Sequence, residues 1–350
     1  MKRLLPRLLW LALLGGGLVP PPGFAASSGP ITVTDLTGRQ VTLQQPARRV
    51  VCLIESALSG LYMLGAEDRI VGISTNIYDS GVFPYYAAMD PRVRGRSLPT
   101  PGNWDFVNLE SVVALQPDLV VIWSGQEESI KALEEKGIPV FAVFIARFSD
   151  IFREIEALGQ LTGTEARATE IVGLVQNRLA EVQRRVATAA DTALPRVYFM
   201  WAQGPLETSG KNSTVQELIE LAGGVNAAAE SPLEHLVVNL EKVLAWNPEV
   251  VVMWYNDRLG PAEVSRTAGW RALAAIRDGR VHELPDVFSC DFWTLKYLFT
   301  VELVARWCHP TRFAGTDLTA LRTELFTRLY GPKLPATALP PLELGTGVAR

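Results

Sequence analysis

Residues that suit ligand recognition stand shortly after several apolar, strand-like runs of the chain. Glu55 and Arg147 each follow such a run in the first half, while Trp201 and Tyr255 close two runs in the second half. In open α/β sheets, ligands bind beyond the carboxyl ends of the strands. These side chains are therefore predicted to face a ligand-binding cleft.

The full set of predicted ligand contacts combines aromatic, charged and amide side chains. It comprises Glu55, Tyr78, Asn103, Trp104, Arg147, Trp201, Lys211, His235, Tyr255 and Asp291. Aromatic rings suit a flat or apolar ligand, whereas Arg147 and Lys211 suit an anionic one. Each aromatic residue could instead belong to the core, but Trp104 stands in a Pro-rich loop beside Asn103, and this position favours the cleft.

Direct metal capture is not predicted. His235, His282 and His309 are the three histidines of the chain, and no two of them stand at the spacing of metal ligands. His282 lies within a strand-like run and His309 at a helix end, so both are interpreted as structural. His235 stays open as a contact to a metal or a chelate, and Tyr78 or Tyr255 could hold a haem iron.

A short unit occurs twice, and it opens on Asn-Leu-Glu each time. "NLESVVALQPDLVVIW" (108–123) and "NLEKVLAWNPEVVVMW" (239–254) align without a gap and share 9 of 16 residues. Asn at a helix N-cap accepts hydrogen bonds from free backbone N–H groups, and a Glu in the first turn is favoured by the helix dipole. Capping explains each Glu, but it does not explain why two distant parts of the chain match.

Two α/β lobes with parallel sheets are predicted on either side of a helical connector. Continuous apolar runs alternate with amphipathic helices over 31–149 and again over 193–331. Between them, 150–192 has no strand-like run and places apolar residues on one face of a long helix. The Pro-rich segment 332–350 is expected to be loosely packed.

The N-terminus has the order of a secretory signal peptide. Lys2, Arg3 and Arg7 precede a short apolar run and a small-residue site that predicts cleavage after Ala25. An uncleaved anchor is the alternative. The net charge of −4 excludes a strong electrostatic footprint for nucleic acid.

The three cysteines cannot form a full disulfide framework, because their number is odd. Cys52 lies in an apolar run and is interpreted as a buried hydrophobic residue. Cys290 and Cys308 could pair in an oxidising compartment, and the sequence leaves this alternative open.

Taken together, these features resemble the periplasmic substrate-binding proteins of iron-chelate and vitamin B12 ABC importers. The resemblance covers most of residues 31–331. It rests on the export signal, the opening "TVTDLTGRQVTLQQPARRVV", the repeated Asn-Leu-Glu units, the connector helix and "TSGKNSTVQELIELAGGVN".

The resemblance implies two Rossmann-like lobes joined by a single long helix, with the ligand in the cleft between them. It implies a periplasmic, non-enzymatic monomer without an intrinsic cofactor, which carries a metal chelate of iron or cobalt to the inner-membrane permease dimer and its ATPase. Glu110 and Glu241 match the positions of the glutamates that dock such proteins onto the permease. A two-fold permease would present the same basic pocket twice.

Two alternatives accompany this interpretation. Some members of the fold class bind a small oxyanion such as molybdate, and the sequence does not distinguish that ligand from a ferric siderophore, cobalamin or haem. A two-lobed chelatase that acts on tetrapyrroles has a similar architecture, and it would need a base in the cleft, for which His235 is the candidate.

Overall fold

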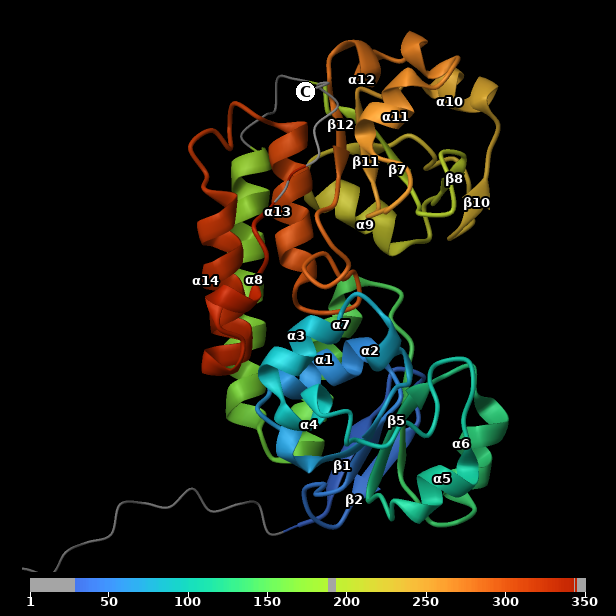
Figure 1. Cartoon of the computed structure of the whole chain (residues 1–350), viewed down its shortest axis with the longest axis vertical. Helices are drawn as coiled ribbons and strands as arrows, with labels where there is room; N and C mark the ends of the chain where they lie inside the picture. The colour runs from blue at the N-terminus through green and yellow to red at the C-terminus, as the bar shows by residue number, and fades with distance from the viewer. Residues whose placement is uncertain (1–28, 188–192, 343, 345–350) are drawn as a thin grey trace, which may run out of the picture.

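The computed structural model describes residues 29–187, 193–342 and 344, and they form two α/β lobes flanked by long helices (Figure 1). The predicted signal peptide and its cleavage site at Ala25 lie outside the described residues. Each lobe contains one four-stranded sheet in which every strand pair is parallel. The predicted fold class is therefore confirmed.

The sheet of the first lobe has the strand order β4-β3-β5-β6. Its strands are β3 (Val50–Cys52), β4 (Ile70–Ile73), β5 (Leu119–Trp123) and β6 (Val140–Val143). All side chains of β3 and β6 are buried, because helices cover both faces of the sheet. A hairpin of β1 (Ile31–Thr34) and β2 (Gln40–Leu43) precedes the sheet.

The turn of this hairpin is held by one buried carboxylate. Asp35 accepts hydrogen bonds from the backbone N–H groups of Thr37 and Arg39, each at 2.9 Å, and pairs with the guanidinium of Arg39. These hydrogen bonds keep the pKa of Asp35 below its usual value, although burial opposes them. Gly38 completes the turn with φ of 92°, a conformation that favours glycine.

The helices of the first lobe are mostly short. They are α1 (Glu55–Met63), η1 (Glu67–Arg69), α2 (Asn76–Asp79), α3 (Phe83–Met89), α4 (Pro91–Arg94), α5 (Leu109–Ala114) and α6 (Glu127–Glu134). Asp90 caps α4, since its carboxylate accepts from the N–H of Arg92, and it also accepts from the hydroxyl of Tyr62 on α1. This buried cap fixes α3 and α4 against α1.

The second lobe repeats the architecture with the strand order β12-β11-β7-β9. Its strands are β7 (Arg196–Met200), β8 (Glu207–Thr208), β9 (Val225–Asn226), β10 (Leu236–Val237), β11 (Val250–Met253) and β12 (Val281–Glu283). Strands β8 and β10 form a separate antiparallel pair. The helices are α9 (Thr214–Leu221), α10 (Leu240–Trp246), α11 (Pro261–Arg266), η2 (Trp270–Ala272) and α12 (Ala274–Arg277).

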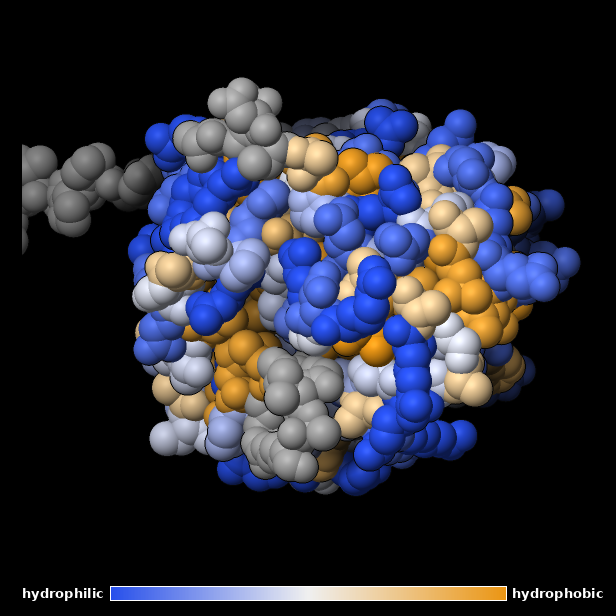
Figure 2. Space-filling model, turned by 90° about the horizontal axis from the view of Figure 1, so that it is seen from above, coloured by the Kyte–Doolittle hydropathy of each residue, from blue (hydrophilic) through white to orange (hydrophobic). Residues whose placement is uncertain are grey.

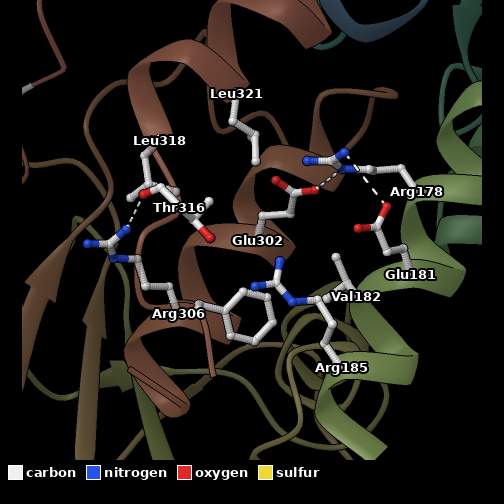
Figure 3. A pocket seen from close by; sticks show the side chains of 10 residues that line it. Arg178, Glu181, Val182, Arg185, Glu302, Arg306, Thr316, Leu318 and Leu321 are labelled. Carbon is white, nitrogen blue, oxygen red and sulfur yellow. Dashed lines mark hydrogen bonds and ion pairs between the residues drawn. The ribbon is translucent and has the colours of Figure 1, made fainter. Parts of the chain in front are cut away.

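Long helices stand on one side of the two lobes (Figure 1). The chain passes from the first lobe through α7 (Phe148–Thr162) into α8 (Glu165–Ala187), which matches the predicted connector. The helix α13 (Tyr297–Cys308) packs beside α8, and α14 (Leu318–Tyr330) packs against α13 and α1. Figure 3 shows the small cavity at this junction, where Arg178 of α8 donates to the buried Glu302 of α13 at 2.8 Å.

The C-terminal segment returns to the first lobe. The hydroxyl of Tyr330 lies 2.6 Å from that of Ser59 on α1, and the carbonyls of Arg328 and Leu329 accept from Arg167. Two short turns follow, η3 (Gly331–Lys333) and η4 (Ala336–Ala338). The stretch that follows α14 is attached at single points: Leu334 is buried, and the carbonyl of Pro340 accepts from the buried Arg322.

Cys52, Cys290 and Cys308 are free, buried thiols, so Cys290 and Cys308 do not form the disulfide that the sequence left open.

Seen from the end of the second lobe, hydrophilic and hydrophobic residues alternate over the surface (Figure 2). No helix in the described part of the chain is both long enough and apolar enough to span a bilayer.

Candidate functional site

The repeated Asn-Leu-Glu unit forms the same local structure in each lobe. The side chain of Asn108 accepts from the N–H of Ser111 at 2.9 Å, and that of Asn239 accepts from the N–H of Lys242 at 2.8 Å. Both asparagines are thus N-caps, as predicted. Glu110 and Glu241 follow in the first turns of α5 and α10, and both are exposed.

Each repeat ends on a tryptophan that faces the cleft between the lobes. Trp123 is the last residue of β5, and Trp254 directly follows β11. Both line the same cavity of about 490 Å³, which contains residues of both lobes. Its lining residues are Ile54, Glu55, Ser56, Val82, Trp104, Trp123, Val143, Phe144, Ile145, Glu234, Trp254, Val287, Asp291 and Trp293.

Aromatic rings dominate the two walls of this cleft. On the first lobe, the rings of Trp123 and Phe144 lie 5.5 Å apart, and Trp104 is half exposed at the rim. On the second lobe, Trp254 lies 6.2 Å from Trp293 and is supported from behind by Phe292, edge-on at 4.8 Å. Such rings offer flat apolar surface with little conformational entropy to lose on binding.

The charged groups that line the cleft are all acids. They are Glu55, Glu234 and Asp291, and no Lys or Arg is among the described residues that line it. The carboxylate of Glu55 accepts from the hydroxyl of Ser74 at 2.6 Å, which fixes its orientation at the start of α1. The cleft therefore offers hydrogen-bond acceptors and negative potential to a ligand.

Asp291 connects the cleft to a buried charged network beneath its floor. The ammonium of Lys296 lies 3.6 Å from the Asp291 carboxylate and 3.8 Å from the ring centroid of Phe288. Burial raises the pKa of Asp291, and Lys296 opposes that rise. Burial likewise lowers the pKa of Lys296, against the attraction of Asp291. The pair exists because each ion compensates the desolvation of the other.

A second acid, Glu154 of α7, lies in the same interior and has no counter-ion among the residues that the structure describes. It is 1% exposed, and its Oε1 atom has no hydrogen-bond partner among the described residues. Burial, with a smaller contribution from the charge of Asp291, raises the pKa of Glu154 to about 8. Glu154 is therefore mostly protonated at neutral pH, which spares the core an uncompensated negative charge.

Three of the ten predicted ligand residues line the cleft, namely Glu55, Trp104 and Asp291. Two others organise the loops behind it. Asn103 donates to Thr75 and Asn76 and accepts from two backbone N–H groups of its own loop. The hydroxyl of Tyr78 donates to the carbonyl of Leu98 at 3.1 Å.

The remaining five predicted residues lie outside the lining of the cleft. Trp201 donates through its indole N–H to Ser209 at 2.8 Å and packs on Trp254 at 5.2 Å, so it supports a cleft wall. Arg147 is the N-cap of α7, and Lys211 and Tyr255 are exposed. The imidazole of His235 lies 2.7 Å from the Glu207 carboxylate.

The other two histidines have structural surroundings. His282 stacks on Trp307 with ring centroids 4.8 Å apart, and burial lowers its pKa to about 4. His309 ends α13, and its Nε2 lies 2.9 Å from the carbonyl of Gly223. Among the residues that the structure describes, no group of three or more His, Cys, Asp or Glu side chains could hold a metal ion.

The sequence predictions missed several cleft residues, and for three of them a signal was present. Phe144 directly follows β6, so the strand-end rule points to it more closely than to Arg147. Glu234 is the neighbour of the predicted His235, and Trp293 stands two residues after Asp291. Val82 and Val287 lie in segments without a periodic pattern, and no sequence signal pointed to them.

Comparisons with known proteins give one family. A family model described as periplasmic binding protein matches residues 50–287. Among similar proteins, an uncharacterized ABC transporter substrate-binding lipoprotein of Bacillus subtilis, YvrC, is 27% identical over 74% of this chain and 80% of its own. The molybdate-binding protein MolA of Haemophilus influenzae is 26% identical over 85% of this chain and 90% of its own length. A cobalamin-binding protein of Halobacterium salinarum is 30% identical over 70% of this chain and 66% of its own length.

Solved structures agree in fold. A periplasmic solute-binding protein from Veillonella parvula aligns with a TM-score of 0.74 at 22% identity and covers 88% of this chain and 94% of its own. The periplasmic vitamin B12-binding protein BtuF of Vibrio cholerae aligns with a TM-score of 0.60 at 22% identity. The alignment covers 75% of this chain and 97% of BtuF.

Proposed function

The chain belongs to the periplasmic binding protein family, and from this premise we propose that it captures a metal chelate of the corrinoid kind and delivers it to an ABC permease. The proposal about the ligand rests on the composition of the cleft. Five aromatic side chains and three carboxylates line about 490 Å³, and the described lining contains no cationic side chain. This composition suits a large, flat, largely apolar ligand that has hydrogen-bond donors and no net negative charge.

A corrinoid has these properties, because its ring is apolar and its edge carries neutral amide groups that donate hydrogen bonds. The carboxylates of Glu55, Glu234 and Asp291 are suitable acceptors for such groups. Relatives named as cobalamin-binding or vitamin B12-binding proteins agree with this choice. A ferric chelate or haem without net negative charge would fit the same cleft by the same reasoning.

Molybdate is the second candidate, since MolA is among the similar proteins. A small oxyanion needs converging cationic or N–H donors. Arg147 and Lys211 are exposed and lie outside the described lining of the cleft. The chelatase alternative has less support, because His235 is not among the lining residues and lies against Glu207.

Isothermal titration calorimetry tests the ligand directly. The purified protein is titrated with cyanocobalamin, with sodium molybdate and with a neutral ferric hydroxamate chelate. The proposal expects one-to-one binding of cyanocobalamin in the micromolar range or tighter and no heat from molybdate. Stoichiometric binding of molybdate without binding of cyanocobalamin would refute it.

Delivery to a permease is supported by Glu110 and Glu241, which are exposed on different lobes in matching structural units. Exposed charges of this kind orient association more than they strengthen it. We expect the double variant Glu110→Ala/Glu241→Ala to bind its ligand normally and to lose stimulation of the ATPase of the cognate permease complex. A matched control, Glu135→Ala/Glu220→Ala, removes one exposed carboxylate from each lobe outside the repeats and keeps full stimulation.

A further inference from the structure

The most exposed large hydrophobic side chains of the described chain occupy matching positions in the two lobes. Val237 is 70% exposed and Phe106 is 62% exposed, more than any other large hydrophobic residue that the structure describes. Phe106 precedes Glu110 by four residues, and Val237 precedes Glu241 by four residues. The repeat therefore extends upstream, as Phe-Val-Asn-Leu-Glu in the first lobe and Val-Val-Asn-Leu-Glu in the second.

The backbone that presents Phe106 is fixed by its own loop. Asn103 accepts from the N–H groups of Asp105 and Phe106, each at 2.9 Å, and donates its own N–H to the carbonyl of Phe106 at 2.7 Å. The side chain of Gln126 donates to the carbonyl of Asp105 at 2.8 Å. The phenyl ring is thus displayed on an ordered loop, so little backbone entropy is lost when a partner covers it.

Val237 is also displayed on ordered backbone, but by a strand pair and not by a loop. It belongs to β10, which pairs with β8 in the register Val237 opposite Glu207, and the N–H of the next residue donates to the carbonyl of Leu206 at 2.9 Å. A shallow hollow lies beside it, with Val237, Glu241 and Ala245 along its walls. Both apolar side chains therefore stand on hydrogen-bonded backbone, and Val237 shares its hollow with the acidic Glu241.

The two carboxylates are available to a partner. No ion pair in the described part of the chain involves Glu110 or Glu241, and the neighbouring Lys242 is instead paired with Glu230. Each lobe thus shows an exposed apolar side chain and, four residues later in the sequence, a carboxylate without an ion pair among the described residues. We call Phe106 with Glu110 the first docking patch and Val237 with Glu241 the second docking patch.

We propose that Phe106 and Val237 are the apolar anchors of these patches, and that their occupant is the outward face of a two-fold permease with a basic group beside an apolar hollow on each half. The inference rests on the proposed function and adds to it the groups that supply affinity. A buried apolar anchor contributes more free energy of binding than an exposed charge, which mainly sets orientation. A two-fold partner explains why both elements recur at the same spacing.

The position of the patches relative to the cleft supports this occupant. Trp104 lines the cleft two residues before Phe106, and Glu234 lines it three residues before Val237. Each patch therefore continues the rim of the cleft on its own lobe. A partner that spans both patches would lie across the mouth of the cleft, where a carried ligand has to leave.

The test is the affinity of the ligand-loaded protein for the cognate permease–ATPase complex in lipid nanodiscs, measured by biolayer interferometry at 0.15 M and 0.5 M NaCl, with cyanocobalamin as the ligand. We expect Phe106→Ser and Val237→Ser each to weaken binding about 10-fold and the double variant about 100-fold at both salt concentrations. The loss caused by Glu110→Ala/Glu241→Ala shrinks at 0.5 M, because salt screens exposed charges.

Val225→Ser is the matched control, since Val225 is 45% exposed and lies in β9 at the edge of the sheet, beside the start of β7 and away from the cleft. It should bind as the wild type does. The exchanged variant Phe106→Val/Val237→Phe should also keep its affinity, because the two halves of a two-fold partner are equivalent.

Unchanged binding of the serine double variant, with binding lost in the glutamate double variant, would overturn the anchors and leave the docking function standing. Unchanged binding of both double variants would overturn both proposals. If Val225→Ser lost as much affinity for the permease complex as Phe106→Ser or Val237→Ser, the anchors would also be overturned. The effect would then not depend on the docking patches.

Discussion

Replacement of Glu154 by glutamine tests how the core beneath the cleft tolerates a buried acid. The side chain is 1% exposed and lacks a hydrogen-bond partner for Oε1 among the described residues. Burial raises its pKa from 4.5 to about 8 in the folded protein. Between these two values the folded state keeps a proton that the unfolded state releases, so the free energy of unfolding falls as the pH rises.

The size of the effect follows from the shift. One pKa unit corresponds to about 1.4 kcal/mol, so this group alone removes on the order of 3–4 kcal/mol of stability between pH 5 and pH 8. Glutamine has nearly the same shape and does not ionise. Glu154→Gln should therefore match the wild type within about 1 kcal/mol at pH 5 and exceed it by about 3 kcal/mol at pH 8.

Urea unfolding at pH 5 and pH 8, followed by tryptophan fluorescence, measures both differences. Glu156→Gln is the control, because Glu156 is exposed two residues farther along α7 and its replacement should change neither stability. Equal stabilities of wild type and Glu154→Gln at pH 8, or a variant that is destabilised equally at both pH values, would refute the burial argument.

Three further variants test other contacts. Trp104→Ala should weaken the binding of cyanocobalamin about 10-fold in calorimetry without lowering Tm, because the ring lines the cleft and is half exposed; unchanged affinity would exclude it as a contact. Arg178→Ala should cost about 2 kcal/mol in urea unfolding, because it leaves Glu302 buried without its ion pair; a smaller loss at pH 8 than at pH 5 would contradict this reason. Tyr330→Phe should cost about 1 kcal/mol, because it removes a buried hydrogen bond to Ser59, and a neutral result would show that this bond adds nothing.

Local features were predictable because local interactions decide them. Asn108 and Asn239 are N-caps in the structure, and the strands before Trp123 and Trp254 end where the sequence indicates. Capping and continuous apolar runs act within a few residues, so the pattern alone is informative. The two-lobed architecture was predictable for the same reason, since apolar runs alternate with amphipathic helices on either side of the connector.

The cleft was harder to predict because long loops decide most of it. Glu55, which lies three residues after the end of β3, is in the lining of the cleft, whereas Tyr78 and Tyr255 were placed by the same rule but lie outside that lining. The short helices α2, α3 and α4 have no apolar periodicity to reveal them. Glu154 resembles an ordinary helix-face glutamate in the sequence, because its burial depends on distant packing.

The return of α14 to the first lobe has a consequence for folding. Ser59 and Tyr330 are 271 residues apart in the chain, and Glu67 pairs with Lys333 over a similar separation. Contacts between residues so far apart in the sequence form late and slowly. We therefore expect the first lobe to reach its full stability only after the last long helix has been synthesised and has packed against it.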